Sequence, residues 1–536
     1  MLTRLTGGRV VDPANGRDAL GDIWFQDGRI VPPPDNGRRP DAEHDATGAI
    51  VLAGGIDIHS HIAGANVNTA RLLLPELRAV GFDSAPVSDT IGRLYAAMGF
   101  TLVVEPAISP HVALQAQLEL AAIPFIDKAI LCVLGNEDYL LGLLRDGESD
   151  DAVADYAART LGGARAIGLK VINPGAAAAF KEDVRHFGLD DIVPRYGVSS
   201  RTIINALQHA AGALGVPHPV HLHCSNLGMP GNVETALATI EAAGDMRLHL
   251  AHLQFYAYGT EGPRGFSSAA PRLAEAMNAN PNITADVGQV MFGQTVTISS
   301  DVLRQFNARG QASPRKWAIN DGDGNGGGIV PYRYRRRNFF NAVQWAAGLE
   351  LFLLINDPWR VFFTTDHPNG APFTAYPDLF ALLMDRDLRA RWIADLPAEA
   401  MQMTTLGSIA REYTWPEIAV MTRAAPARLL GLADRGHLAP GARADIAVYR
   451  PGADLASSFR NAELVFKDGV LIARNGQMGP AIFGKVLNVD PGFDRAIESR
   501  LAAFYDQIYG VPHTAFDVPL HAVARPEPFE AVPCTR

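Results

Sequence analysis

The 536-residue sequence contains very little cysteine. Its three cysteines, Cys132, Cys224 and Cys534, are too few for a disulfide framework and cannot supply the four thiolates that an iron–sulfur cluster usually needs. The sequence also lacks any run of about eighteen consecutive apolar residues, which a membrane-spanning helix needs. Its first residues lack the long apolar core of a signal peptide. We therefore expect a cytoplasmic protein that does not bind a membrane.

Positive charge is scarce as well. The chain has 47 Lys and Arg against 57 Asp and Glu, a net charge of −10, which disfavours non-specific binding to nucleic acid. Hydrophobic residues make up 48% of the chain, enough for a sizeable core and too many for a disordered protein. The length suits a large barrel with an accessory domain.

The central part of the chain alternates short β-rich apolar runs with Ala- and Leu-rich helical stretches. This is the pattern of βα units on a parallel sheet, and no short repeat indicates a solenoid or propeller. The expected strands are 51–61, 100–105, 129–134, 166–172, 220–224, 248–253, 283–287 and 361–366. Strands in this number predict an α/β fold with a TIM (β/α)8 barrel, although an open α/β sheet can have as many.

The two ends of the chain share a different pattern, in which short β-segments alternate with turns. If these ends pair, they form one small composite β-domain from residues 1–50 plus 433–489. The barrel then occupies residues 51–432. Residues 490–536 are rich in proline and turns, and we expect a C-terminal arm lying over this or another subunit.

Two histidines stand at the end of the first expected strand. Residues two apart on a strand share a face, so His59 and His61 both point into the barrel mouth, where barrel enzymes place their active sites. Two neutral imidazoles on one face can hold a divalent metal such as zinc. The alternative is a pair of ordinary polar residues. The position after an apolar strand and a Gly-Gly turn favours the metal site.

The fourth expected strand contains Lys170 within an apolar run. A buried ammonium group without a partner is costly, so this lysine needs a reason. One interpretation is an ion pair with a nearby carboxylate. The other is carboxylation by CO₂, which turns the side chain into an anionic ligand that can bridge two metal ions.

Further candidate ligands follow on later strands. The fifth strand places His221 and His223 on one face, the sixth presents His252, and the eighth ends at Asp366. A lone histidine is more often part of the core than a ligand. The ordered combination on strands one, four, five, six and eight therefore carries the prediction of a metal centre.

This set resembles the dinuclear amidohydrolase superfamily. The resemblance is carried by His59, His61, Lys170, His223, His252 and Asp366, together with GHLAPGARADIAVYRPG in the C-terminal β-segment. It implies two zinc ions, one held mainly by His59 and His61 and the other by His223 and His252. It further implies that carboxylated Lys170 bridges them and that Asp366 is the catalytic base. His221 either donates a hydrogen bond to the substrate oxygen or supports its neighbour.

A closer resemblance is to the family of formylmethanofuran dehydrogenase A subunits and their relatives in bacterial formyltransferase/hydrolase complexes. It is carried by GGIDIHSHIAGANVNTAR, HLHCSNLGMPGN, HLAHLQFYAYGTEG, GGGIVPYRYRRRNFFNAVQWAAGLEL and DPWRVFFTTDHPNGAPFTAYPDL. It implies zinc-dependent hydrolysis of the formyl amide of formylmethanofuran, or of a bacterial methanofuran analogue, to formate and the free amine. The expected partners are the other subunits of such a complex, acting in one-carbon metabolism.

Methanofuran-type carriers have γ-linked glutamates, whose carboxylates suit arginine. The candidate substrate-binding residues are Asn68 and Arg71, just after the first strand, and Arg333, Arg335 and Arg336 in a basic run. The alternative for the basic run is a solvated face.

Three other functions stay open. A free-standing cyclic-amide hydrolase of the hydantoinase type would share the metal site. A scaffold could keep the barrel without catalysis. The A subunit of a CO₂-reducing formylmethanofuran dehydrogenase would depend on partner subunits for the reduction, since this chain has too few cysteines for iron–sulfur clusters.

Overall fold

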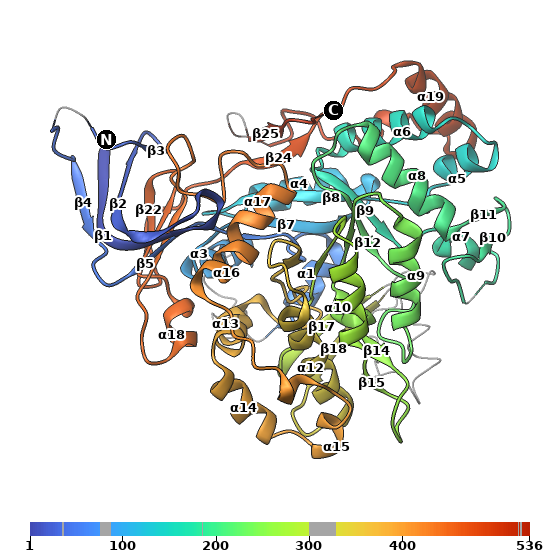
Figure 1. Ribbon diagram of the computed structural model, residues 1–536. Helices are drawn as coiled ribbons and strands as arrows, with labels where there is room; N and C mark the ends of the chain where they lie inside the picture. The colour runs from blue at the N-terminus through green and yellow to red at the C-terminus, as the bar shows by residue number, and fades with distance from the viewer. Residues whose placement is uncertain are drawn as a thin grey trace.

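Eight parallel strands form the central sheet of the computed structural model, which describes residues 1–34, 37–74, 87–184, 186–299, 328–523, 525 and 528–535 (Figure 1). They are β6 (Gly55–Asp57), β7 (Phe100–Ile108), β8 (Asp127–Leu134), β9 (Gly168–Ile172), β12 (Val220–His223), β13 (Leu248–Leu250), β16 (Ile283–Asp286) and β19 (Val361–Phe362). Neighbours in this order are hydrogen-bonded. A parallel bridge between Ser60 and His367 joins the first strand to the last, which confirms the TIM barrel.

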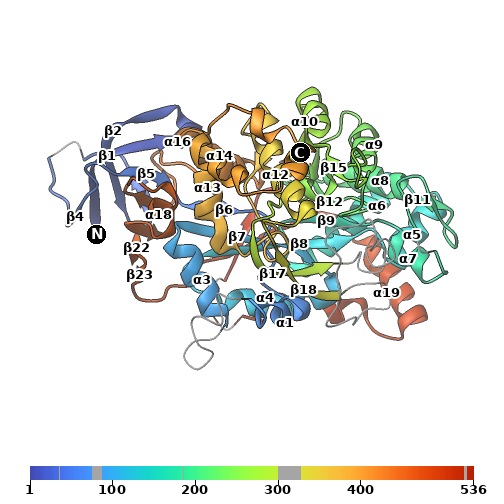
Figure 2. The same ribbon diagram turned by 90° about the horizontal axis from the view of Figure 1, so that it is seen from below.

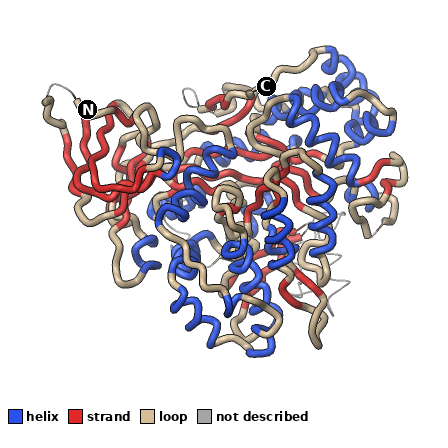
Figure 3. The backbone as a smooth tube through the Cα atoms, in the orientation of Figure 1, coloured by secondary structure: helices blue, strands red, loops and turns tan. Residues whose placement is uncertain are grey.

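Helices connect these strands and cover the outside of the barrel (Figure 3). They include α3 (Val87–Ala97), α4 (Ala113–Ala121), α6 (Asp150–Ala164), α8 (Ser200–Ala213), α9 (Val233–Ala243), α10 (Ala270–Ala279) and α12 (Phe339–Leu354). Ser149, Ser199 and Asn338 begin α6, α8 and α12, because each side chain accepts a hydrogen bond from a backbone N–H of the first turn. Among the described residues, no helix is long and apolar enough to cross a membrane.

A second sheet is built from both ends of the chain and lies beside the barrel in both views (Figures 1 and 2). The N-terminal part gives β1 (Leu2–Asp12), β2 (Arg17–Gln26), β3 (Arg29–Val31), β4 (Ala42–Asp45) and β5 (Ile50–Ala53). The C-terminal part gives β20 (Ile446–Tyr449), β21 (Leu464–Lys467), β22 (Val470–Arg474) and β23 (Gln477–Met478). Strand β5 pairs with β1 on one side and with β20 on the other, so the two ends form one composite sheet as expected.

The expected strand at residues 51–61 is divided in the structure. Its first part is β5 of the composite sheet and its second part is β6 of the barrel, and the chain passes between them at Gly54. A Cβ atom at Gly54 would lie 2.1 Å from Oγ1 of Thr101, so only glycine fits at this crossing.

The C-terminal segments pack against the barrel. Strand β24 (Val486–Val489), which the sequence grouped with the composite domain, pairs with β8 and with β25 (Phe529–Val532) instead. Between them, α19 (Ala496–Tyr509) contacts α6, and Arg159 forms ion pairs with Glu498 at 2.9 Å and Asp517 at 2.7 Å. The division into 1–50 plus 433–489, 51–432 and 490–536 stays a prediction.

Candidate active site

A cavity of about 530 Å³ opens at the carboxyl ends of the barrel strands. All six candidate metal ligands line it: His59, His61, Lys170, His223, His252 and Asp366. Much of the remaining wall is apolar and includes Val67, Ile108, Val133, Leu227 and Phe255. The fold therefore brings together in one cavity side chains that are up to about three hundred residues apart in the sequence.

The rings of His59 and His61, at the end of the first strand, are held in the same way, each between two carboxylates. Nε2 of His59 lies 3.1 Å from Oδ1 of Asp366, and Nε2 of His61 lies 3.3 Å from the same oxygen. On the opposite edge of each ring, Nδ1 meets a different carboxylate, Asp286 at 2.9 Å and Glu105 at 3.0 Å. Because a carboxylate only accepts, Nδ1 of each ring carries a proton, and Nε2 is the nitrogen that faces the cavity, where it meets the carboxylate of Asp366.

His252 and Asp366 are held in left-handed backbone conformations, with φ of 35° and 50°. Such conformations are uncommon for residues other than glycine and concentrate at functional sites. The ring of His252 lies 4.7 Å from that of His223, centroid to centroid. The bends after β13 and β19 therefore aim both side chains at the same region of the cavity.

Burial and neighbouring charges shift the titration of the site. Burial lowers the pKa of Lys170 to about 8, although the nearby carboxylates of Asp286 and Asp366 oppose this shift. Burial alone would also lower the pKa of His61, but Glu105 and Asp366 outweigh it and raise the pKa to about 9. The cavity thus combines imidazoles, an amine and carboxylates in a place of low solvent access.

The donor set fits a divalent transition metal. One ligand atom each from His59, His252 and Asp366 lie within 4.8 Å of one another. Nδ1 of His252 is buried and makes no hydrogen bond among the described residues, and the buried Nε2 of His59 faces the carboxylate of Asp366 at 3.1 Å. Buried polar atoms without partners are rare, and a bound ion is one explanation for them. Imidazole nitrogen and carboxylate oxygen are ligands that zinc accepts.

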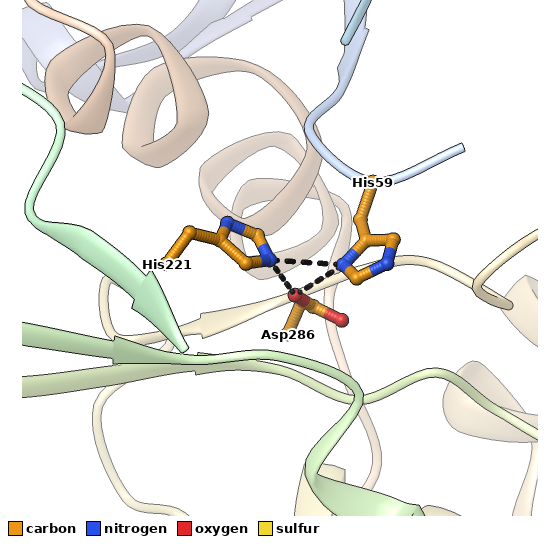
Figure 4. Close-up of side chains that lie close together, drawn as sticks. All are labelled: His59, His221 and Asp286. Carbon is orange, nitrogen blue, oxygen red and sulfur yellow. Dashed lines mark hydrogen bonds and ion pairs between the residues drawn. The ribbon is translucent and has the colours of Figure 1, made fainter. Parts of the chain in front are cut away.

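His221 lies beside His59 (Figure 4), and it does not line the cavity. Its Nε2 is 3.0 Å from Nδ1 of His59 and 3.2 Å from Oδ2 of Asp286, and the side chain is fully buried. Of the two roles left open for His221, these contacts match the supporting one.

The candidate substrate-binding residues lie away from the cavity wall. In α1 (Ala65–Arg71), Nη1 of Arg71 donates to Oδ1 of Asn68 at 3.2 Å, and Nδ2 of Asn68 donates to Glu119 at 2.9 Å. Arg71 is only 3% exposed, and burial lowers its pKa to about 10. Neither Arg71 nor Asn68 lines the cavity.

The basic run begins in β18 (Gly328–Tyr334), which forms a hairpin with β17 (Gly293–Ser299), and continues beyond it. Arg333 and Arg335 are exposed, whereas the guanidinium of Arg336 lies 3.9 Å from the ring centroid of Trp392 and 3.5 Å from Asp395. None of the three arginines lines the cavity.

The sequence reasoning missed Glu105 and Asp286, which hold the two histidines of the first strand. A signal for them existed, since both are acidic residues at or next to the ends of the expected strands 100–105 and 283–287. Carboxylates at the carboxyl ends of barrel strands belong to the site region.

The comparisons with known proteins agree with this geometry. The amidohydrolase family matches residues 42–473. The A subunit of the formyltransferase/hydrolase complex Fhc of Methylorubrum extorquens is 50% identical over 100% of both chains. Protein FwdA of Methanocaldococcus jannaschii is 35% identical over 91% of this chain and 90% of its own length. The chain therefore belongs to the amidohydrolase family and, within it, groups with the A subunits of formyltransferase/hydrolase complexes.

Solved structures support the same grouping. One match is a chain in the X-ray structure of the FhcABCD complex from Methylorubrum extorquens, determined with methylofuran. The match covers 100% of this chain and 100% of that chain, with a TM-score of 0.93. A D-aminoacylase structure covers 90% of this chain and 99% of its own, with a TM-score of 0.52 at 15% identity, and shows the fold alone.

Proposed function

We propose that this chain hydrolyses the formyl amide of formylmethanofuran, or of a methanofuran-type analogue, to formate and the free amine. We further propose that it works as the A subunit of a formyltransferase/hydrolase complex in the cytoplasm. The observation that carries the proposal is the convergence of all six candidate ligands on one cavity. Identity of 50% over the whole chain to the A subunit of such a complex supports the choice of substrate.

The proposed metal ligands are His59, His61, His223, His252, Asp366 and Lys170, the last carboxylated. Two zinc ions bound there would polarise the formyl oxygen and make water acidic enough to act as a nucleophile at neutral pH. Carboxylation is proposed because Lys170 is almost completely buried yet lines the cavity among these ligands, where an anionic oxygen donor is more useful than an ammonium group.

Asp366 is the proposed base. Its Oδ1 accepts a hydrogen bond from Nδ2 of Asn369 at 2.9 Å, and its backbone N–H donates to Oγ1 of Thr364 at 3.0 Å. These contacts fix the carboxylate at the cavity wall, where it takes a proton from the attacking water. The same proton then passes to the leaving amine, so the carboxylate is regenerated at the end of each turnover.

The apolar residues of the cavity wall have a different role from the candidate ligands. Ile108, Val133, Leu227 and Phe255 line the same cavity as the ligands. An apolar wall accommodates an uncharged group next to the formamide and displaces water that does not react.

The test uses the purified complex, loaded with zinc, and measures formate released from the formylated carrier. The proposal predicts stoichiometric formate and free amine, with no need for a reductant or an electron acceptor. Turnover of a hydantoin but not of the formylated carrier would favour the free-standing cyclic-amide hydrolase. Partner subunits carrying molybdenum or tungsten with iron–sulfur clusters would favour the CO₂-reducing complex. A metal-loaded complex inactive on both substrates would leave the scaffold interpretation.

A further inference from the structure

Asp286 stands at the end of β16, is fully buried and lies at the centre of four close contacts, of which Figure 4 draws those with His59 and His221. Its Oδ2 is 2.9 Å from Nδ1 of His59, 3.2 Å from Nε2 of His221 and 3.1 Å from Nε2 of His249. Its Oδ1 accepts the backbone N–H of His252 at 2.7 Å. One carboxylate therefore contacts residues on or just after β6, β12 and β13.

The contacts around Asp286 indicate where the imidazole protons lie, with Nδ1 of His59 and Nε2 of His221, 3.0 Å apart, both directed at Oδ2 of Asp286. Because the carboxylate accepts, the nitrogens of His221 and His249 that face it carry protons. The second nitrogen of each ring is then a hydrogen-bond acceptor, and a group that can donate a hydrogen bond lies next to it. Nδ1 of His249 lies 2.9 Å from Oγ1 of Thr284, and Nδ1 of His221 lies 3.1 Å from Nε2 of His218.

The same rule decides the state of His59. Its Nδ1 proton is directed at Asp286, so Nε2, which faces Asp366 in the cavity, is the nitrogen that would bind a metal ion in place of a proton. The bond to the backbone N–H of His252 holds the strained turn that presents a ligand of the second metal. Glu105 does the corresponding work for His61, through Nδ1 at 3.0 Å, and its Oε2 accepts the backbone N–H of Ala63 at 2.9 Å.

We propose that Asp286 is a positioning residue of the metal centre, which fixes the tautomer of His59 and the backbone of His252. The inference rests on the proposed function in so far as this requires a bound metal. Asp286 holds the metal through these two residues and touches neither substrate nor metal itself.

A metal ion bound directly by His59, His221 and Asp286 is the competing interpretation, because their ligand atoms also lie within 4.8 Å of one another. Two observations count against it. Neither His221 nor Asp286 lines the cavity, and His249 places a third donor against the same carboxylate oxygen. Oδ2 of Asp286 is therefore already in contact with three imidazole nitrogens.

The variant Asp286→Asn keeps the shape but replaces one acceptor oxygen with an NH₂ group. If this NH₂ group meets the imidazole N–H groups, a ring must change its tautomer to avoid contact between two donors. If instead the remaining oxygen stays there, the NH₂ group meets the backbone N–H of His252. We expect zinc affinity to fall by about ten- to a hundredfold, the usual cost of losing such an outer partner.

The matched control is Glu350→Gln. Glu350 is another fully buried carboxylate, which accepts from Oγ1 of Thr405 at 2.8 Å and from Ser268, and it does not line the cavity. It reports the general effect of changing a buried carboxylate to an amide. We expect its zinc affinity to equal that of the wild-type complex.

The measurement is the zinc dissociation constant of the intact complex, obtained by competition with a chromophoric chelator, with thermal unfolding followed in parallel. Weaker binding in Asp286→Asn but not in Glu350→Gln supports the inference. Unchanged binding in folded Asp286→Asn overturns it and leaves the proposed function intact. A wild-type complex that binds no zinc contradicts both.

A second measurement needs no variant at Asp286 and covers the case in which Asp286→Asn does not fold. The zinc-loaded wild-type complex with ¹⁵N-labelled histidine gives the protonation of each ring nitrogen, and loss of one signal in His59→Gln assigns His59. A protonated Nδ1 and a metal-bound Nε2 at His59 support the inference. Metal at Nδ1 of His59 overturns it in favour of the competing site.

Discussion

The imidazoles of His59 and His61 are polarised by the carboxylates on their far side. Asp286 and Glu105 each accept the Nδ1 proton of one ring, and both rings turn Nε2 toward Asp366. An imidazole held in this way is a better ligand, because its orientation is fixed and its free nitrogen is more basic.

Replacing Lys170 with alanine removes the proposed bridge between the two zinc ions. We expect Lys170→Ala to bind fewer than about two zinc ions per chain and to lose hydrolysis. Elemental analysis of the purified complex measures the first effect and formate release the second.

The matched control for Lys170 is Lys128→Met, since Lys128 is also fully buried but donates to the backbone oxygens of Ile123 and Ile126, at 3.0 and 2.9 Å. This control should lose stability and keep its zinc. Full zinc and activity in Lys170→Ala, or a bare amine in a high-resolution density map, would contradict the carboxylated bridge.

The variant Asp366→Asn removes the proposed base while keeping its shape. We expect kcat for formate release to fall by about a hundredfold or more if general-base catalysis is lost. Zinc content has to be measured in the same sample, because Asp366 is also a candidate ligand. Near-normal turnover by a zinc-loaded Asp366→Asn complex would reject this role, and His221 or His367 would be tested next.

At this scale the sequence predicted the side chains that meet in the cavity but not those that hold them. His59, Lys170 and Asp366 could be found because each stands on or after an expected strand in a recognisable motif. Asp286 and Glu105 act through contacts between strands, and the partner of an imidazole on a distant strand cannot be read from local spacing.

The hairpin of β17 and β18 connects the cavity with the basic run. Thr297, Ile298 and Gly328 at one end line the cavity, while Arg333 lies near the other end of the hairpin and Arg335 follows it. A carrier with its formamide in the cavity and its tail along this hairpin would bring glutamyl carboxylates toward the exposed arginines.

Charge reversal tests this path. We expect the double variant Arg333→Glu, Arg335→Glu to raise KM for a glutamylated carrier more than it lowers kcat, because the reacting group is bound elsewhere. Steady-state kinetics with a carrier that lacks its glutamates is the control and should show no change. Arg336 is left out, since its guanidinium packs on Trp392. An unchanged KM would instead support the interpretation of the basic run as a solvated face.

At the level of elements, the eight expected strands all occur, because alternating β and α patterns report local preference. The first expected strand was too long, however. An apolar run that passes from one sheet into another looks like one continuous strand in the sequence. Only the close approach of Gly54 to Thr101 in the structure shows where the two strands separate.

A buried group of charges joins the composite sheet to the barrel. Nζ of Lys467, at the end of β21, lies 3.1 Å from Asp445, 2.8 Å from Asp468 and 3.2 Å from Asp127 at the start of β8. Arg435 also contacts Asp127, at 3.0 Å. These carboxylates raise the pKa of Lys467 although burial opposes them, so the lysine is charged and offsets part of their negative charge.

Removing this charge takes the Lys467 partner away from buried Asp445 and leaves Asp127 paired with Arg435. We expect Lys467→Met to lower the free energy of unfolding by about 3–5 kcal/mol. Chemical unfolding of the isolated chain measures it. Arg450→Met is the control, because Arg450 is an exposed residue next to the same sheet that pairs with Glu463 at 2.8 Å, and its loss should change stability little. Equal effects of the two variants would contradict a structural role for the buried group.

For the whole molecule, the sequence indicated that the two chain ends form one sheet, since both have the same short β-segments and turns. It did not indicate that β24 joins the barrel, because pairing between distant strands depends on the completed fold. The ion pairs between Arg159 and the C-terminal arm, and the charges around Lys467, are likewise contacts between parts far apart in sequence.

Anomalous X-ray scattering at the zinc edge, from crystals of the zinc-loaded complex, tests the metal centre most directly. We predict two peaks in the cavity, one beside His59 and His61 and one beside His223 and His252, with density for a carboxylated Lys170 between them. The absence of any peak there, or a peak bound by His221 and Asp286, would contradict the proposed metal centre.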